Sequence, residues 1–241
     1  MVIRLTAILA LLFAFPAPAT AQELEGEYLY KVSTVRAATG ELSNLLDWIA
    51  VLKGSEYFAD AGKEPPFVMR HSQGDQWDLL IITPMESWTS YYSDAATKHV
   101  ELLTPVKMML AFAEDHFAYG PPLSTLTAAY GANSFFHIEM FEAAPGKADV
   151  LFEQRRMENA YLAATKQTTN MIFRRAAGSN VDVFTIGFHK SLEAFAAPGS
   201  VTDEEKESAA KAAGFKDRSD ISFYLRSLIS GHHDTLAVKV E

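Results

Sequence analysis

The 241-residue sequence contains no cysteine, which excludes disulfides, redox-active thiols and cysteine-ligated metal. Basic residues are few, since 21 lysines and arginines stand against 30 aspartates and glutamates, and they form no cluster. This charge balance argues against a nucleic acid or an anionic membrane surface as a partner. The zinc-protease motif His-Glu-x-x-His and the nucleophile motif Gly-x-Ser-x-Gly are also absent, so neither class of hydrolase is indicated.

The N-terminal segment has the three parts of a secretory signal peptide. Arg4 supplies an early positive charge, residues 5–15 form an apolar run, and Ala19-Thr20-Ala21 form a cleavage site before Gln22. The apolar run is shorter than the ~20 residues that a membrane-spanning helix needs, and no later run is long enough. We therefore expect cleavage near Ala21–Gln22, a periplasmic or secreted protein, and no membrane anchor.

The sequence does contain an internal repeat. Residues 69–88 align without a gap on residues 173–192. The identical pairs are Arg70 and Arg174, Gly74 and Gly178, Asp78 and Asp182, Ile82 and Ile186, and Ser87 and Ser191. About one identity would be expected over this length from average residue usage. The repeat therefore predicts a protein built from two related halves.

The first half predicts a strand, a helix and a hairpin. Alternating residues at 28–35 indicate a strand. In the helix that follows, apolar residues between Leu42 and Leu52 fall on one stripe. The hairpin has its arms at residues 67–71 and 77–83, and a glycine lies in its turn.

The second half predicts the same order of elements. A strand at residues 134–141 precedes a helix that ends near residue 165, and a hairpin covers residues 170–188. The final strand is expected at residues 235–240. Residues 121–133, which are rich in glycine, proline, serine and threonine, are expected to link the two halves.

Helices are also expected at residues 86–92 and 202–214, and an extended piece near residue 117. The resulting order strand–helix–strand–strand–helix–strand is that of a ferredoxin-like unit. Because the strand at residues 77–83 is apolar on both faces, each sheet needs cover on its second face as well. The predicted fold class is therefore α+β, with two tandem ferredoxin-like βαββαβ repeats packing sheet to sheet into an eight-stranded α/β barrel. We assign residues 1–21 to the signal peptide, 22–128 to the first repeat and 129–241 to the second.

These features resemble a known group of proteins. The opening strand and helix, the hairpin and residues 77–88, echoed in the second half, are similar to a tandem member of the dimeric α/β-barrel superfamily, in the style of NIPSNAP-like and antibiotic-monooxygenase-like proteins. The resemblance covers nearly all of the mature chain, but as architecture. No catalytic motif maps residue by residue, so the resemblance implies a fold and no particular activity.

The repeated arginines are the first ligand-binding candidates. Arg70 and Asp78, and likewise Arg174 and Asp182, occur on adjacent strands of a hairpin, where an arginine and a carboxylate pair well. One interpretation is a charged cluster that lines the barrel and binds an anionic or polar small molecule. The interpretation that we favour is a structural ion pair, repeated because the halves share an origin.

Histidines and aromatic residues supply further candidates. His116 and His233 are expected at the same place in the two halves, at the start of each final strand. Residues 232–234 offer three potential metal ligands, but neighbours in a strand point to opposite faces, so no more than one or two could reach one ion. We therefore predict no metal site. Trp77 and Phe184 are candidates for the wall of an apolar pocket.

Haem enters only through the resemblance, since the superfamily includes haem enzymes. That implies His116, His137, His189 and His233 as potential axial ligands, and nothing in their spacing selects one. Glu139 is a single carboxylate without a partner that the sequence identifies. No fixed cofactor is predicted.

The predicted function is binding of a small apolar or amphipathic molecule in a barrel cavity. The alternatives are an oxygenase-like enzyme on the same barrel, either cofactor-independent or haem-dependent, and a structural protein with a filled barrel. Apart from that ligand no partner is expected. Because both sheets belong to one chain, we expect a monomer with an internal pseudo-dimer, or a weak homo-oligomer.

Overall fold

The computed structural model of the chain describes residues 24–240, except residues 57, 59–62, 95–105 and 198. The first half contains β1 (Tyr28–Ala37), α1 (Leu42–Gly54), β2 (Phe67–Gln73), β3 (Leu79–Glu86), α3 (Trp88–Asp94), the 3-10 turn η2 (Lys107–Met109) and β4 (Leu110–Gly120). The connecting helix is α5 (Leu123–Ala132). The second half contains β5 (Phe135–Ala143), α6 (Ala148–Ala164), β6 (Asn170–Ala177), β7 (Val183–His189), α7 (Leu192–Ala196), α8 (Asp203–Ala212), α9 (Asp220–Leu228) and β8 (Ile229–Lys239). The predicted signal peptide and its cleavage site lie outside the described residues.

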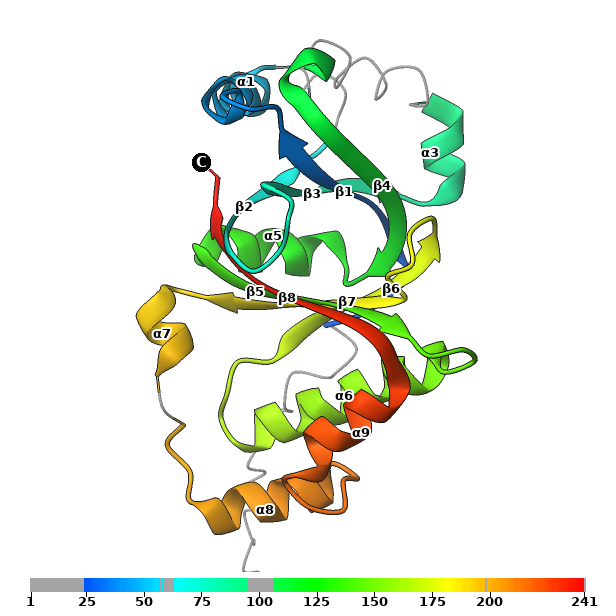
Figure 1. The fold of residues 1–241 in the computed structure, drawn as a ribbon, viewed down its shortest axis with the longest axis vertical. Coiled ribbons are helices and arrows are strands. Elements are labelled where there is room, and N and C mark those ends of the chain that lie inside the picture. The colour runs from blue at the N-terminus through cyan, green and yellow to red at the C-terminus, as the bar shows by residue number, and fades with distance from the viewer. Residues whose placement is uncertain (1–23, 57, 59–62, 95–105, 198, 241) are drawn as a thin grey trace, which may run out of the picture.

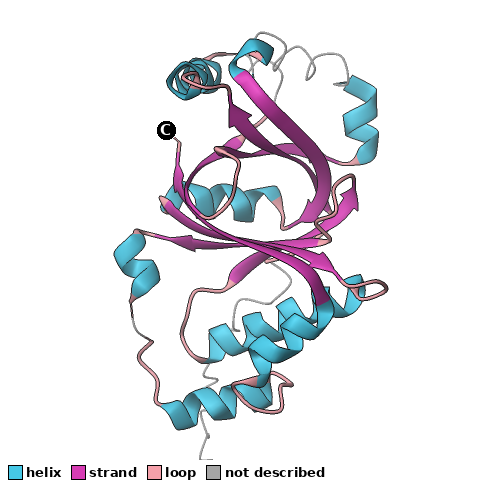
Figure 2. Ribbon diagram, in the orientation of Figure 1, coloured by secondary structure: helices cyan, strands magenta, loops and turns pink. Residues whose placement is uncertain are grey.

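The eight strands form one closed antiparallel barrel in the order β1-β3-β2-β8-β5-β7-β6-β4. Each half has the same strand order, since β4-β1-β3-β2 in the first half corresponds to β8-β5-β7-β6 in the second. The pairs β2–β8 and β4–β6 join the halves. The predicted fold class is therefore confirmed, and most helices lie outside the strands (Figure 1, Figure 2). No helix among the described residues is both long and apolar enough to cross a membrane.

The repeated aspartate has the same structural task in both halves. Asp78 Oδ2 accepts a hydrogen bond from the backbone N–H of Ala37 at 2.8 Å. Asp182 Oδ2 accepts one from the N–H of Ala143, also at 2.8 Å. Each carboxylate thus ties its hairpin to the end of β1 or β5. The identity seen in the sequence reflects this repeated backbone geometry.

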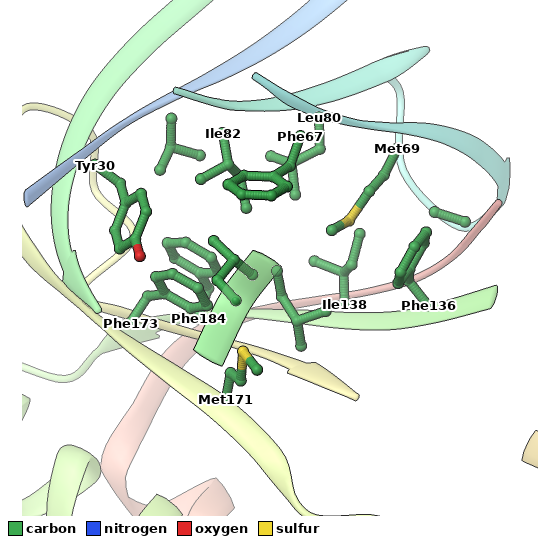
Figure 3. Close-up of a cluster of buried hydrophobic side chains, with 14 of the residues drawn as sticks. Tyr30, Phe67, Met69, Leu80, Ile82, Phe136, Ile138, Met171, Phe173 and Phe184 are labelled. Atoms are coloured by element: carbon green, nitrogen blue, oxygen red, sulfur yellow. The ribbon is translucent and has the colours of Figure 1, made fainter. Parts of the chain in front are cut away.

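The middle of the barrel is filled with side chains. Large residues from both sheets point toward one another there (Figure 3), and they include Tyr30, Phe67, Met69, Leu80, Ile82, Phe136, Ile138, Met171, Phe173 and Phe184. The rings of Phe173 and Phe184 stack with their centroids 4.4 Å apart. The expected ligand cavity therefore does not occupy the centre of the barrel.

The connection between the halves differs from the linker expected at residues 121–133. It is largely the helix α5, which lies between the two sheets (Figure 1). Leu126 and Tyr130, four residues apart on one face, are buried in the barrel core. Pro122 stands at the start of the helix, where its missing N–H costs no intrahelical hydrogen bond. The expected boundary between residues 128 and 129 falls within this helix.

Candidate functional site

The repeated arginines do not form the expected pairs. Arg174 contacts Asp149 instead of Asp182, and both partners are at least half exposed. The partner of Asp182 is Arg175, whose Nη2 lies 2.6 Å from the carboxylate. The reason is strand alternation. Arg174 and Arg175 point to opposite faces of β6, and only Arg175 is on the side of Asp182. For the exposed Arg70, no acid within salt-bridge distance occurs in the part of the chain that the structure describes.

The other candidates gather at one end of the barrel. Trp77, His116 and His233 line a hollow of about 250 Å³ there, together with Glu114. Phe184 lies deeper and presents its ring edge-on to His116, with centroids 5.9 Å apart. Sequence candidates from four different segments therefore do meet, at the mouth of the barrel and not at its centre.

His116 and His233 are not equivalent, contrary to the expectation. Gly178 approaches the backbone of β4 so closely that a Cβ atom added to it would lie 3.3 Å from His116 Cα. In the other half, a Cβ added to Gly74 would lie 2.9 Å from Thr235 Cα. The counterpart of His116 is thus Thr235. The counterpart of His233 is Glu114, so the expected alignment of the two histidines was wrong by two residues.

His116 is a buried, uncharged residue. Its side chain and backbone are only 3% exposed, and Nε2 has no hydrogen-bond partner among the described residues. Burial lowers the pKa of His116 to about 4, although the nearby Asp115 opposes the shift. At neutral pH His116 is therefore a neutral core residue and offers no positive charge to a ligand.

A second hollow, of about 390 Å³, lies outside the barrel in the second half. It is bounded by the outer face of the sheet, α6 and α7. The sheet contributes His137 and His189, α6 contributes Glu158 and Leu162, and α7 contributes Phe195. Burial, followed by the neighbouring His137, lowers the pKa of His189.

Charged side chains form one wall of this cavity and continue beside it on β5 and β8. Glu139 and Asp234 stand directly opposite each other in the antiparallel pair. His137 Nε2 lies 2.6 Å from Asp234 Oδ1, and His232 Nε2 lies 3.5 Å from Glu139 Oε1. From α6, Arg155 Nη1 lies 3.6 Å from Glu139 Oε2. Two carboxylates are therefore held close together by three nitrogen-bearing side chains.

Arg155 is the most deeply buried charge of this network, at 2% exposure. It contacts Glu158 as well as Glu139, and its Nε donates a 2.7 Å hydrogen bond to Gln154 Oε1. The guanidinium group also lies over the ring of Phe141, 4.6 Å from the centroid. A buried guanidinium is tolerated only when it is paired and hydrogen-bonded in this way.

The network shifts the pKa values of its members. Burial raises the pKa of Glu158. Burial acts in the same direction on Glu139, but the hydrogen bond from His232 and nearby cations outweigh it, so the pKa of Glu139 is lowered. For His137 burial would lower the pKa, yet the hydrogen bond to Asp234 and the surrounding carboxylates leave it raised.

Part of this network follows from strand alternation in the sequence. Glu139 has no partner that its sequence neighbours identify, but alternation along the apolar strand β5 places it on the same face as His137. On β8 the same rule places His232 and Asp234 on that face and His233 on the other, as expected for neighbouring residues. What could not be predicted was the register of β5 on β8, which sets Glu139 directly opposite Asp234.

Comparisons with solved structures agree with the topology. An anthrone oxidase-like protein is 12% identical, with a TM-score of 0.58, over 91% of this chain and 94% of the other. A proposed monooxygenase from Lactobacillus acidophilus NCFM is 10% identical, with a TM-score of 0.53, over 89% and 95%. A mutant chlorite dismutase from Candidatus Nitrospira defluvii is 11% identical, with a TM-score of 0.50, over 89% and 92%.

The chain has the fold of the dimeric α/β-barrel superfamily. The resemblance drawn from the sequence is thereby confirmed at the level of fold. No protein-family profile and no curated protein matches the chain. A shared fold does not by itself imply a shared activity.

Proposed function

We propose that the cavity beside α6 is the functional site and that it binds a small polar organic molecule. One observation carries this proposal: a buried charged network of Arg155, Glu139 and Glu158 borders a hollow of about 390 Å³. Such a network is costly to bury and stabilises a fold no better than apolar packing does. Titratable groups gathered at the wall of a cavity are typical of a binding or catalytic site.

The lining indicates the chemistry of the ligand. The segment after α6 brings Lys166, Gln167, Thr168 and Asn170 to the cavity, and the sheet brings Glu139. A ligand with a carboxylate or carbonyl group toward Lys166, and a hydroxyl or amino group toward Glu139, would satisfy both sides. This differs from the apolar ligand that the sequence predicted inside the barrel.

A second proposal is that the protein is an oxygenase-like enzyme which uses this cavity. The names of two proteins with a similar fold, an anthrone oxidase-like protein and a proposed monooxygenase, support it. The cavity volume also falls within the roughly 300–1,000 Å³ that is common for small-molecule sites. Oxygen uptake with hydroxylated aromatic compounds, measured with an oxygen electrode, tests this proposal, and no uptake above the buffer rate would reject it.

The residues fit a small polar molecule better than haem. Of the histidines that the resemblance implied as axial ligands, His116 is enclosed by the core and His233 lies at the barrel mouth. His137 and His189 do line the cavity, but most of the lining is polar or charged. A porphyrin would place broad apolar faces against these groups, which costs free energy. A Soret band in the purified protein would overturn this assignment.

Two tryptophan variants of α7 test the site itself. Ala194 lines the cavity, whereas Ala196 is exposed on the same helix and does not line it. Native mass spectrometry identifies a co-purifying molecule, and its addition should raise the melting temperature of the wild type. Ala194→Trp should abolish that rise by filling the cavity, and Ala196→Trp should preserve it. Equal responses of both variants would place the binding site elsewhere.

We also propose that the protein acts after export, as a monomer. The signal-peptide pattern supports export, and closure of the barrel within one chain supports a monomer. N-terminal sequencing of the protein from a Gram-negative host should begin at or near Gln22. Light scattering should give the mass of a single chain.

A further inference from the structure

Part of the charged network has the composition of a metal site. We propose that His137, Glu139 and Asp234 bind a divalent transition-metal ion, with His232 as the fourth ligand. This inference rests on the proposed function, because the ion would lie at the wall of the same cavity. Metal binding can nevertheless be measured without a substrate, so the two proposals can fail separately.

The geometry is close to that of a bound ion. The potential ligand atoms of His137, Glu139 and Asp234 all lie within 4.8 Å of one another. Metal bonds of about 2.0–2.2 Å to nitrogen and oxygen place neighbouring ligand atoms about 3–3.5 Å apart in a tetrahedral site. Binding an ion would therefore require the three donor atoms to draw closer together by rotation of their side chains.

The sheet presents these ligands on one face. His137 and Glu139 are two residues apart on β5, and His232 and Asp234 are two residues apart on β8. The two carboxylates stand directly opposite each other across the strand pair. Like charges in that position are destabilising, and a cation between them removes the repulsion.

The surrounding residues orient one ligand and leave negative charge to be neutralised. Glu139 Oε2 is held by Arg155 at 3.6 Å and by the hydroxyl of Thr185 at 3.3 Å. Its other oxygen, Oε1, faces His232. Outer contacts of this kind fix the direction of a metal-binding carboxylate. Arg155 contacts Glu139 and Glu158, whereas the partner of Asp234 is His137, so a divalent ion would add positive charge beside the two ligand carboxylates.

The donor set indicates the class of metal. Imidazole and carboxylate donors together suit Zn²⁺, Fe²⁺, Mn²⁺ or Co²⁺, whereas Mg²⁺ and Ca²⁺ favour oxygen ligands alone. His137 and Glu139 also line the cavity of about 390 Å³, so a bound ion would be accessible to a small molecule there. An open side of this kind distinguishes a catalytic metal site from a structural one.

The first half shows the same strand positions without a metal-binding composition. Asp78 N–H donates to Val35 O, and Asp182 N–H donates to Phe141 O, which aligns β1 with β5. By this alignment the counterparts of His137 and Glu139 are Lys31 and Ser33. The counterpart of Asp234 is Asp115, and Lys31 Nζ lies 2.9 Å from it. A fixed ammonium group thus replaces the histidine, which suggests a substitution that folds but cannot bind metal.

The test titrates the full mature chain after dialysis against EDTA. Zn²⁺ in competition with a chromophoric chelator gives stoichiometry and affinity, and Co²⁺ gives a visible absorption band that reports coordination. The wild type should bind one ion per chain. His137→Lys and Asp234→Asn should each weaken binding by about 100-fold or more, and His232→Ala by about 10–100-fold. His233→Ala, on the opposite face of β8, is the matched control and should bind as the wild type does.

Three results would overturn the inference: no stoichiometric binding by the wild type, an unchanged affinity in His137→Lys, or an equal loss in His233→Ala. Circular dichroism checks that each variant folds, and Asp234→Asn carries the test if His137→Lys does not. If the wild type binds no metal but still shows the ligand-induced rise in melting temperature, the metal site is rejected and the proposed function stands. If it binds metal but shows no such rise, the proposed function is rejected and the metal site stands.

Discussion

The two halves of the barrel share one strand order but use the outer faces of their sheets differently. In the first half, α1 buries Leu45 and Ile49 against the sheet, and the hollow left beside it, lined partly by Trp48 and Leu52, has a volume of only about 60 Å³. In the second half, α6 covers the equivalent face and leaves about 390 Å³. The polar residues that α6 buries are Gln154, Arg155 and Asn159.

The difference shows what duplication permits. Strand pairing, the hairpin turns and the aspartate hydrogen bonds to the backbone are common to both halves, so they define the fold. The helix-to-sheet interface is free to vary, because the barrel core holds the two sheets together from the other side. One half keeps an apolar interface that stabilises the protein, and the other accepts a buried charged network beside a cavity. Function is expected where stability was given up.

The largest expected effect comes from breaking that network at its centre. Arg155→Leu should lower the free energy of unfolding by about 3–5 kcal/mol, because it leaves Glu139 and Glu158 buried without their cation. Urea denaturation at neutral pH, followed by circular dichroism, measures the change. The triple variant with leucine at all three positions should regain most of the loss, since apolar packing then replaces the network as in the first half.

This prediction has a clear failure. If Arg155→Leu costs less than about 1 kcal/mol, the arginine behaves as an exposed ion pair does and the interface is not a buried polar one. The two halves would then differ in composition but not in physical character.

A second comparison concerns His116 and its counterpart Thr235. Since burial holds the pKa of His116 at about 4, the folded state excludes a proton that the unfolded state binds below its ordinary pKa near 6.5. Stability should therefore be unaffected above pH 6.5 and fall as the pH drops toward 4. The loss should reach on the order of 3 kcal/mol.

The variant His116→Thr installs the residue of the other half. It should flatten the acid side of the stability curve, measured by urea denaturation at intervals between pH 7.5 and 4.5, even if it lowers stability uniformly through lost contact with Phe184. Asp115, Glu114, Arg175 and His233 lie near His116, and they remain in the variant. An acid slope equal to that of the wild type would assign the effect to those neighbours.

Much of the fold could be predicted from the sequence because local patterns and the internal repeat agreed. The hairpins, with their glycine turns, pair the two middle strands of each half, and the ferredoxin-like order supplies the places of the first and last strands. The error at residues 121–133 came from composition, since glycine, proline and serine suggested a loop. Burial of Leu126 and Tyr130 in the barrel overrides that preference and forms α5.

The candidate site could be predicted less well, because it depends on contacts between distant segments. Trp77, His116 and His233 do share a hollow, as aromatic and histidine candidates from both halves. The network of the second half joins β5, β8 and α6, and residues 139, 155 and 234 carry no spacing that reveals their contact. The predicted fold places β5 beside β8, but it gives neither their register nor the residue of α6 that reaches them.

Substituting the repeated aspartates should have a moderate effect on the free energy of unfolding. Asp78→Ala and Asp182→Ala should each lower the free energy of unfolding by about 1–3 kcal/mol, because each leaves a strand-end N–H without its charged acceptor. Asp182→Ala should be the more harmful of the two, since it also removes the partner of Arg175. Chemical denaturation of both variants measures the difference. If only one of the two variants loses stability, the hydrogen bond common to both halves does not stabilise both of them.

The smallest expected effect separates two neighbouring arginines. Arg174 is repeated in the sequence and was expected to form a stabilising pair, yet its contact with Asp149 is exposed on both sides. Exposed ion pairs contribute about 0–1 kcal/mol, because water screens the charges and the long side chains lose rotamer freedom.

Arg175 is not part of the repeat, but its partner Asp182 is largely buried and also holds the end of β5. Arg175→Ala should therefore lower the melting temperature by more than Arg174→Ala. In 1 M salt this difference in melting temperature should shrink only as far as the Arg175–Asp182 pair is exposed to solvent, since salt screens exposed charges. Differential scanning calorimetry of the two variants resolves such a difference. If Arg174→Ala is the more destabilising change, the repeated arginine has a structural role that its exposed contact does not explain.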